Sequence, residues 1–453
     1  MKPVYKITMS LLVAFLIAGS TYAQQVRTFS LQESIDYAHE NNPNLKSAQA
    51  AINSSEARVG EILAAGLPQI NASANLTDNY IIPTSFLPAA VFDPTAPSDL
   101  FVPVKFGTKY TGAASINLEQ MIFNGSYFVG LKASKTYTEL SRKDFIKTET
   151  DVVEAIKKAY YSVLVSKERA ELVDKNFQRL DSLLAQTKAQ YENGFVEKID
   201  VNRVQVQYNN ISNTRKTSAI GLEVSYNLLK FQMGYPISEP LALSDDLESL
   251  KLTILDTDFK DDFQYSNRIE YSTLEINRSL VEYDIKNTKS QYLPSLDLFG
   301  NYGSSYGTST ANSLIQFGPN WRALGSVGLR ASMPIFDGFR KSKIIQQKKA
   351  QLNQIDNSLE LTKSQIDLQQ VQASMTFESN LETLRTQKQN MDLSKEVYDV
   401  AVIKYQQGVG SNLEVIDADA AYKEAQTNYY AALYDTLISS VELEKSYGKI
   451  LTK

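Results

Sequence analysis

Apolar residues recur at every seventh position along two long stretches of this chain in which proline is absent. The first stretch carries the pattern at Ile156, Val163, Ala170, Phe177, Leu184 and Tyr191. The second carries it at Phe377, Leu384, Met391, Tyr398 and Tyr405. A sustained spacing of seven is typical of long helices that pack as coiled coils, although a simple helical bundle shows the same period. We predict two long helices, the first of which would measure about 95 Å over residues 127–190.

Four other segments alternate apolar and polar residues with a period of two. They are residues 70–76, 110–118, 296–302 and 327–335. This pattern is typical of membrane β-strands with one apolar and one polar face, and also of half-buried strands in a soluble sandwich. The scarcity of other strand-like sequence favours the membrane interpretation. Because an open sheet edge cannot lie in hydrocarbon, other copies must complete the barrel: two copies would supply about eight strands, and three about twelve.

These signals occur twice in the same order. Tyr191-Glu192-Asn193-Gly194 recurs as Tyr405-Gln406-Gln407-Gly408, and Ile122-Phe123-Asn124-Gly125 recurs as Ile335-Phe336-Asp337-Gly338. Leu67-Pro68 recurs as Leu293-Pro294. We therefore predict an internal structural repeat, with residues 24–240 as the first copy and 241–453 as the second. Shorter helices are expected at residues 31–65, 200–233 and 264–292, and a mixed segment of loops at about 234–262.

The chain begins with the features of an exported protein. Residues 1–23 combine Lys2 and Lys6 with a short apolar core and a small residue, Ala23, which predicts a cleavable signal peptide. No later apolar run approaches the roughly 20 residues that a transmembrane helix needs. The Pro-rich tract 83–103 and the segment 304–322, which contains Trp321, are predicted to be cell-surface loops.

Composition argues against an enzyme. The chain has no cysteine and one histidine, His39, so disulfides, thiolate metal sites and Ser-His or Cys-His catalysis are excluded. A net charge of −5 without a basic cluster argues against nucleic acid as a partner. We expect no cofactor and no metal.

The two turn motifs give the chain a resemblance to a family. Tyr191-x-x-Gly194 followed by Asp200, and Tyr405-x-x-Gly408 followed by Glu414, Asp417 and Ala418, resemble the TolC-type outer-membrane efflux proteins over residues 29–451. The resemblance implies a membrane α+β fold: a homotrimeric 12-stranded β-barrel, with four strands per chain, continued by a long α-helical coiled-coil barrel in the periplasm. It further implies a passive channel on which a periplasmic adaptor and an inner-membrane pump dock.

The same resemblance suggests a site at the helix turns. It implies that Glu414 and Asp417 line the periplasmic entrance, with Glu414 in place of the usual aspartate. Residues at i and i+3 share a helix face, so a trimer would carry two acidic rings that favour cations. Asp200 and Arg203 are the equivalents in the first half, and an acid–base pair between the halves would hold the entrance closed. The alternative is that these are solvated first-turn residues that favour the helix dipole.

The glycines of the turn motifs are expected at the tips of the helices. These are Gly194, Gly408 and Gly410, and in the family they also contact the adaptor. The leading function is the exit duct of a tripartite efflux system in the outer membrane. A duct of a type I protein secretion system and a non-conducting coiled-coil envelope protein are the alternatives.

Overall fold

The computed structural model describes residues 26–247, 263–314 and 318–451, and it divides into two compact units. The helical unit comprises residues up to Ala51, Arg142–Thr273, and Leu359 onward. The sheet unit comprises Ile52–Ser141 and Leu274–Ser358. The predicted signal peptide, residues 1–23, lies outside the described residues.

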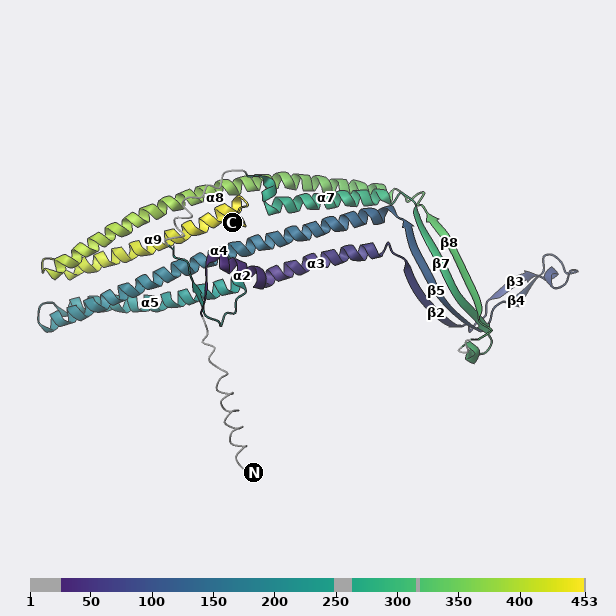
Figure 1. The fold of residues 1–453 in the computed structure, drawn as a ribbon, viewed down its shortest axis with the longest axis horizontal. Helices are drawn as coiled ribbons and strands as arrows, with labels where there is room; N and C mark the ends of the chain where they lie inside the picture. Colours follow the sequence, from purple (N-terminus) through teal and green to yellow (C-terminus); the bar gives the residue numbers. More distant parts are fainter. Residues whose placement is uncertain (1–25, 248–262, 315–317, 452–453) are drawn as a thin grey trace, which may run out of the picture. The chain divides into compact units, whose positions relative to one another are not determined.

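The sheet unit contains one antiparallel sheet of four strands, as the alternating segments predicted (Figure 1). Its strands, in spatial order, are β2 (Gln69–Asp78), β5 (Tyr110–Phe123), β7 (Ser295–Thr308) and β8 (Arg322–Ser332). The prediction for the last strand was wrong at its end, because β8 stops at Ser332 rather than at residue 335. Pro334 explains the difference, since proline has no N–H to donate to a neighbouring strand.

The register of the sheet separates apolar from polar residues. Ile70, Leu118, Gly300 and Val327 are paired in one row across the four strands. The adjacent row consists of Asn71, Asn117, Asn301 and Ser326. Because successive side chains point to opposite faces, one face of the sheet is apolar and the other polar. Polar side chains bond across the second face, where Ser326 Oγ lies 3.0 Å from Asn301 Oδ1.

The connections between the strands are more ordered than predicted. The Pro-rich tract was expected to be a loop, but it forms a hairpin of β3 (Thr84–Pro88) and β4 (Phe101–Lys105) around the short helix η1 (Ala89–Val91). The connection between β7 and β8 contains the short helix η3 (Ala311–Leu314), and residues 315–317 are outside the described part of the chain.

Long helices follow the strand pairs, and helices of half their length accompany them. The long helices are α4 (Gly125–Glu192, 68 residues) and α8 (Arg340–Gln406, 67 residues). The return helices are α5 (Lys198–Met233, 36 residues) and α9 (Asn412–Ser446, 35 residues). The remaining helices are α2 (Leu31–Asn41), α3 (Pro43–Ala64), α7 (Ile269–Ser290) and the short η2 (Tyr265–Asn267). The order α3-β2-β5-α4-α5 thus recurs as α7-β7-β8-α8-α9. Among the described helices, none is both long and apolar enough to cross a membrane.

Two of the predicted short helices differ in detail. Residues 31–65 were predicted as one helix, but Asn42 is extended and separates α2 from α3. The cause is Pro43, because a residue before proline is pushed out of the helical region. The helix predicted from residue 264 begins only at Ile269, since the residue before it, Arg268, is extended.

The core of the helical unit confirms most of the sevenfold pattern. Ile156 and Val163 of α4 are fully buried, and they cluster with Leu433, Leu437 and Val441 of α9. The pattern fails at its last position in the first stretch, where Tyr191 is 43% exposed. Tyr405, which also stands one residue before the end of its helix, is half-buried instead.

A small belt lies against the middle of the core. β1 (Arg27–Phe29) pairs in parallel with β6 (Leu241–Leu243), which belongs to the predicted mixed segment. The Tyr160 hydroxyl of α4 lies 2.9 Å from Asp245 Oδ2 and 3.1 Å from the Phe29 carbonyl oxygen. Burial raises the pKa of Tyr160, and the hydrogen bond to Asp245 adds to that rise. The rest of the mixed segment, residues 248–262, lies outside the described residues.

Candidate functional site

Both helix hairpins of the helical unit turn at a glycine with a left-handed backbone. Gly194 has φ 77° and Gly408 has φ 74°, a region that residues with a Cβ rarely adopt. In each turn the following N–H bonds back five residues, from Phe195 to Gln190 and from Val409 to Lys404. This pattern is a Schellman C-cap, which satisfies carbonyls at the helix end. The predicted tip turns are therefore present at Gly194 and Gly408.

Gly410 has a different reason to be glycine. Its φ is not among the positive values, but a Cβ at this position would lie 2.9 Å from the Lys404 Cβ. The close approach arises because the Gly410 N–H also donates to the Lys404 carbonyl, at 3.1 Å.

Each return helix begins with a capped first turn that contains the predicted acidic residue. The Ser411 hydroxyl accepts the Glu414 N–H at 3.2 Å, and the Glu197 N–H donates to Asp200 at 3.4 Å. Glu414 and Asp417 are both exposed. Asp200 and Glu414 therefore occupy the same helix position, where a negative charge also favours the helix dipole.

The predicted base pairs within its own helix. Arg203 Nη1 lies 3.6 Å from Asp200 Oδ1, one turn away, and the two side chains are 44% and 21% exposed. The structure therefore brings Asp200 and Arg203 together within α5. In a single chain, the contact between the two tips is made by the buried Asn412, whose Nδ2 lies 3.5 Å from the Asp200 carbonyl oxygen.

A second link joins the long helices just before their turns. The Tyr405 hydroxyl of α8 donates to Gln190 Oε1 of α4 at 2.8 Å. Burial raises the pKa of Tyr405, so this phenol is neutral. Its equivalent in the first half, Tyr191, is exposed. The two turn motifs share a backbone conformation, but their tyrosines differ in burial and in hydrogen bonding.

Sequence reasoning missed a polar layer between α4 and α9, formed by Asn176, Arg179, Asp419, Lys423 and Gln426. Asp419 is 7% exposed in its side chain and binds Arg179 at 2.7 Å and Lys423 at 2.5 Å. Asn176 Nδ2 donates to Gln426 Oε1 at 3.0 Å, and both residues are buried. In sequence these residues look like the solvent-facing positions of a polar helix, so no local signal identified them.

Two aromatic rings hold the guanidinium of the polar layer. Arg179 lies 4.5 Å from the ring centre of Tyr398 on α8 and 5.7 Å from that of Tyr422 on α9. The rings themselves are stacked, with centres 6.1 Å apart. One arginine therefore connects three helices through charge and ring contacts.

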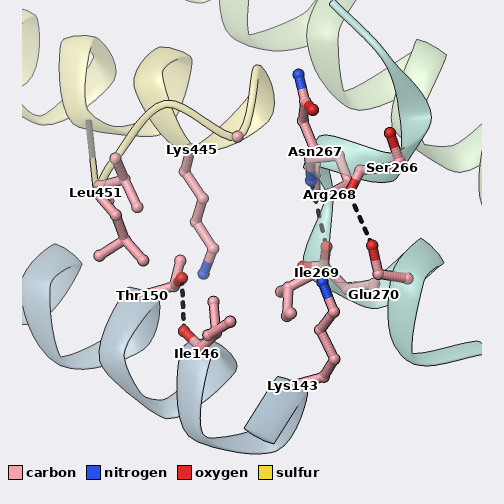
Figure 2. A pocket seen from close by; sticks show the side chains of 13 residues that line it. Lys143, Ile146, Thr150, Ser266, Asn267, Arg268, Ile269, Glu270, Lys445 and Leu451 are labelled. Atoms are coloured by element: carbon pink, nitrogen blue, oxygen red, sulfur yellow. Dashed lines mark hydrogen bonds and ion pairs between the residues drawn. The ribbon is translucent and has the colours of Figure 1, made fainter. Parts of the chain in front are cut away.

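A further polar cluster surrounds a cavity of about 170 Å³ in the helical unit (Figure 2). Figure 2 shows Lys445 extending from α9 toward Ile146 and Thr150 of α4. Lys445 binds Glu154 at 2.6 Å, and the buried Arg268 donates to the Ser446 carbonyl oxygen at 2.9 Å. Arg268 thus caps the C-terminus of α9, where a positive charge is favourable.

Three of the charged residues that line this cavity, Arg268, Glu270 and Lys445, have ion-pair partners. Arg268 also bonds Gln369 at 2.9 Å and Glu270 at 3.2 Å. Burial raises the pKa of Glu154, but hydrogen bonds from Lys445 and Lys158 outweigh it and hold that pKa below its ordinary value. The bonds of Lys445 and Arg268 therefore join α4, α8 and α9. Among the described residues, no cluster of His, Cys, Asp and Glu is arranged to hold a metal ion.

The comparisons with known proteins agree with this architecture. The family model described as outer membrane efflux protein matches residues 34–215 and 267–449, together more than half of the chain. The outer membrane protein TolC of Vibrio cholerae is 23% identical over 97% of this chain and 95% of its own. The alkaline protease secretion protein AprF of Pseudomonas aeruginosa is 20% identical over 75% of this chain and 69% of its own. The crystal structure of the Campylobacter jejuni CmeC outer membrane channel superposes with a TM-score of 0.71 at 16% identity, covering 92% of this chain and 85% of that one.

The sheet with one apolar and one polar face and the paired long and half-length helices have the fold of the solved outer membrane channels. The chain belongs to the outer membrane efflux protein family and is an outer-membrane transport protein. Members of this family are channels rather than enzymes.

Proposed function

We propose that three copies of this chain close a twelve-stranded barrel in the outer membrane and form an exit duct that reaches into the periplasm. The observation that carries the proposal is the division of the four-stranded sheet into an apolar and a polar face. Its strands are 10 to 14 residues long, enough for a tilted strand to cross a bilayer. The edges β2 and β8 carry unpaired backbone groups, which hydrocarbon does not tolerate.

The number three follows from the need for a water-filled lumen. Two copies would supply about eight strands, and side chains fill the interior of a barrel of that size. Three copies supply about twelve strands and leave room for a channel. Family membership supports the same number.

We propose that the duct conducts passively and that an inner-membrane pump, joined through a periplasmic adaptor, supplies the energy. The helix turns offer the adaptor a surface. Phe195 and Val409 directly follow the two turn glycines and are 81% and 79% exposed. Exposed apolar residues at matched positions suit a partner that contacts the turns around Gly194, Gly408 and Gly410.

Glu414 and Asp417 are proposed to line the periplasmic entrance as two acidic rings in the trimer. Their exposure in the single chain and their spacing on α9 support this role. The pair Asp200 and Arg203 is proposed to act in closing the entrance. On closure, Arg203 would leave Asp200 in its own helix and pair with a carboxylate on α9. This exchange costs little free energy because Arg203 and Asp200 are both partly exposed to solvent.

We further propose that residues 24–240 and 241–453 are two copies of one ancestral unit. The recurring order of helices and strands and the two matched ranges of the family model support this division.

The second candidate is a duct for protein secretion. It is favoured by the similarity to AprF, whose description names alkaline protease secretion. The same barrel and helices would serve both functions, and only the cargo and the pump would differ.

A planar-bilayer recording on the purified protein tests the channel. We expect discrete conductance steps after insertion, because a lumen of about twelve strands is filled with water. Insertion of the protein into the bilayer without conductance steps would contradict the proposal. Drug accumulation and secreted protein, measured in a strain that lacks the gene and in the complemented strain, then separate efflux from secretion.

A further inference from the structure

The β3–β4 hairpin presents an apolar face to solvent. Its register places Phe86 opposite Pro103 and Pro88 opposite Phe101, so these four side chains share one face. Phe86 is 68% exposed and Phe101 is 54% exposed. We call this face the Phe86–Phe101 face.

The opposite face of the hairpin is also apolar. Leu87 and Val104 are half-buried there, and Val102 is 37% exposed. A two-stranded hairpin is marginally stable in water by itself, and one with two apolar faces needs a cover. Residues 79–109 contain four charged residues, Asp93, Asp99, Lys105 and Lys109, whose charges cancel. The missing partner is therefore an apolar surface rather than a charged one.

The position of the hairpin selects which surface that is. It leaves the edge strand β2 after Asp78, at the end of the sheet away from α3, and extends beyond it (Figure 1). Only residues 79–83 separate β2 from β3, a reach of about 17 Å at most. In a closed barrel, the free edge of β2 meets the free edge of β8 in the next copy. That neighbouring copy is therefore a surface within reach of the hairpin.

We propose that the Phe86–Phe101 face packs against a second copy of this chain and clasps adjacent subunits at the outer rim of the barrel. The inference rests on the proposed closed barrel and extends its interface beyond the paired strands. The Pro residues of the hairpin support it, because they keep this two-stranded arm stiff and block pairing with further strands.

The test compares the double variant Phe86→Ser/Phe101→Ser with Phe92→Ser. Phe92 is 61% exposed but lies outside β3 and β4, so it matches the change in chemistry without touching the face. The readout is the temperature at which the oligomer dissociates in detergent, followed by native electrophoresis. We expect the double variant to dissociate several degrees below the unmodified protein and Phe92→Ser to match it.

A disulfide scan tests the barrel separately. The chain has no cysteine, so introduced pairs are unique. Asn75→Cys on β2 is combined with Leu324→Cys, Ser326→Cys or Gly328→Cys on β8, all on the polar face of the sheet. Within one chain β5 and β7 separate these positions by roughly 14 Å, too far for a disulfide. Any cross-link therefore joins two copies.

The outcomes are distinct. Cross-links together with selective loss of stability in Phe86→Ser/Phe101→Ser support the clasp. Cross-links with equal stability of all variants overturn the clasp and leave the barrel intact. Absence of cross-links at every tested register overturns the barrel and the clasp with it. A loss of stability in lipid vesicles but not in detergent assigns the face to lipid and overturns the clasp.

Discussion

Single residues distinguish the two halves of this chain more than its elements do. Tyr405 binds Gln190, whereas its equivalent Tyr191 is exposed. Asp417 is an acid, whereas its equivalent Arg203 is a base that pairs with Asp200. These differences lie at the helix turns, which we propose form the channel entrance.

The acidic pair gives the first prediction. Replacing Glu414 with Gln and Asp417 with Asn removes the proposed rings of negative charge. The entrance should then lose its preference for cations over anions. The shift in reversal potential under a salt gradient should fall toward zero in single-channel recordings. Glu424→Gln, farther along α9, is the control. An unchanged potential in the double variant would contradict the pore-ring role.

Glu154 gives a prediction on pH. Burial raises its pKa, but the lysine hydrogen bonds prevail, and its folded pKa lies below the ordinary value of 4.5. A lowered carboxyl pKa stabilises the fold at neutral pH, and this contribution is lost as pH falls below about 4.5 through the folded pKa. We expect Glu154→Gln to melt below the unmodified protein at pH 7, with the difference vanishing at acidic pH. Glu360→Gln, at a side chain 73% exposed, should show no such convergence.

At the scale of elements, backbone conformation decides where the hairpins turn. Gly408 has φ 74°, and a Cβ there would meet nothing within 4 Å. The cost of Gly408→Ala is therefore backbone strain alone, about 1 kcal/mol. Gly221 lies inside α5 with equally free space, so Gly221→Ala should stabilise by about 0.5–1 kcal/mol. Thermal melting followed by circular dichroism should shift in opposite directions, and a shared direction would contradict this account.

The two faces of the sheet give a second prediction at this scale. Ala74 and Ser73 are neighbours in β2 but point to the apolar and the polar face, respectively. Lysine on a lipid-facing strand position costs about 2–4 kcal/mol at the bilayer midplane, whereas a lumen position tolerates it. Ala74→Lys should reduce the heat-stable oligomer in isolated outer membranes, and Ser73→Lys should not. If Ser73→Lys reduced the oligomer and Ala74→Lys did not, the assignment of the lipid-facing and lumen-facing sides would be reversed.

At the scale of the whole molecule, the sheet is incomplete by itself. The two edge strands need partners, and a duct needs more strands than two chains supply. We expect native mass spectrometry of the detergent-extracted protein to give three times the mass of the mature chain. A stable monomer that still conducts would contradict the assembly.

The sequence predicted the elements well because their signals are local. The sevenfold and twofold periods reflect the geometry of helix and strand, so four strands and two long helices appeared where expected. Pro43 divided one predicted helix in two through its effect on the preceding residue, and Pro334 ended β8 early because it has no N–H. The β3–β4 hairpin was missed because residues 83–103 contain five prolines, a content that is typical of loops.

The site was predictable only in part. The turn glycines and the first-turn acids are read from motifs, since each depends on its own backbone. The polar layer forms only where α4 lies beside α9. Asn176 therefore bonds to Gln426, and Arg179 to Asp419, only after folding. Sequence alone thus determined the long helices, the four strands of the main sheet and the two helix turns, because those follow from neighbouring residues. The tertiary structure decided which polar residues are buried in pairs and which strand edges stay open, because both depend on segments far apart in the chain.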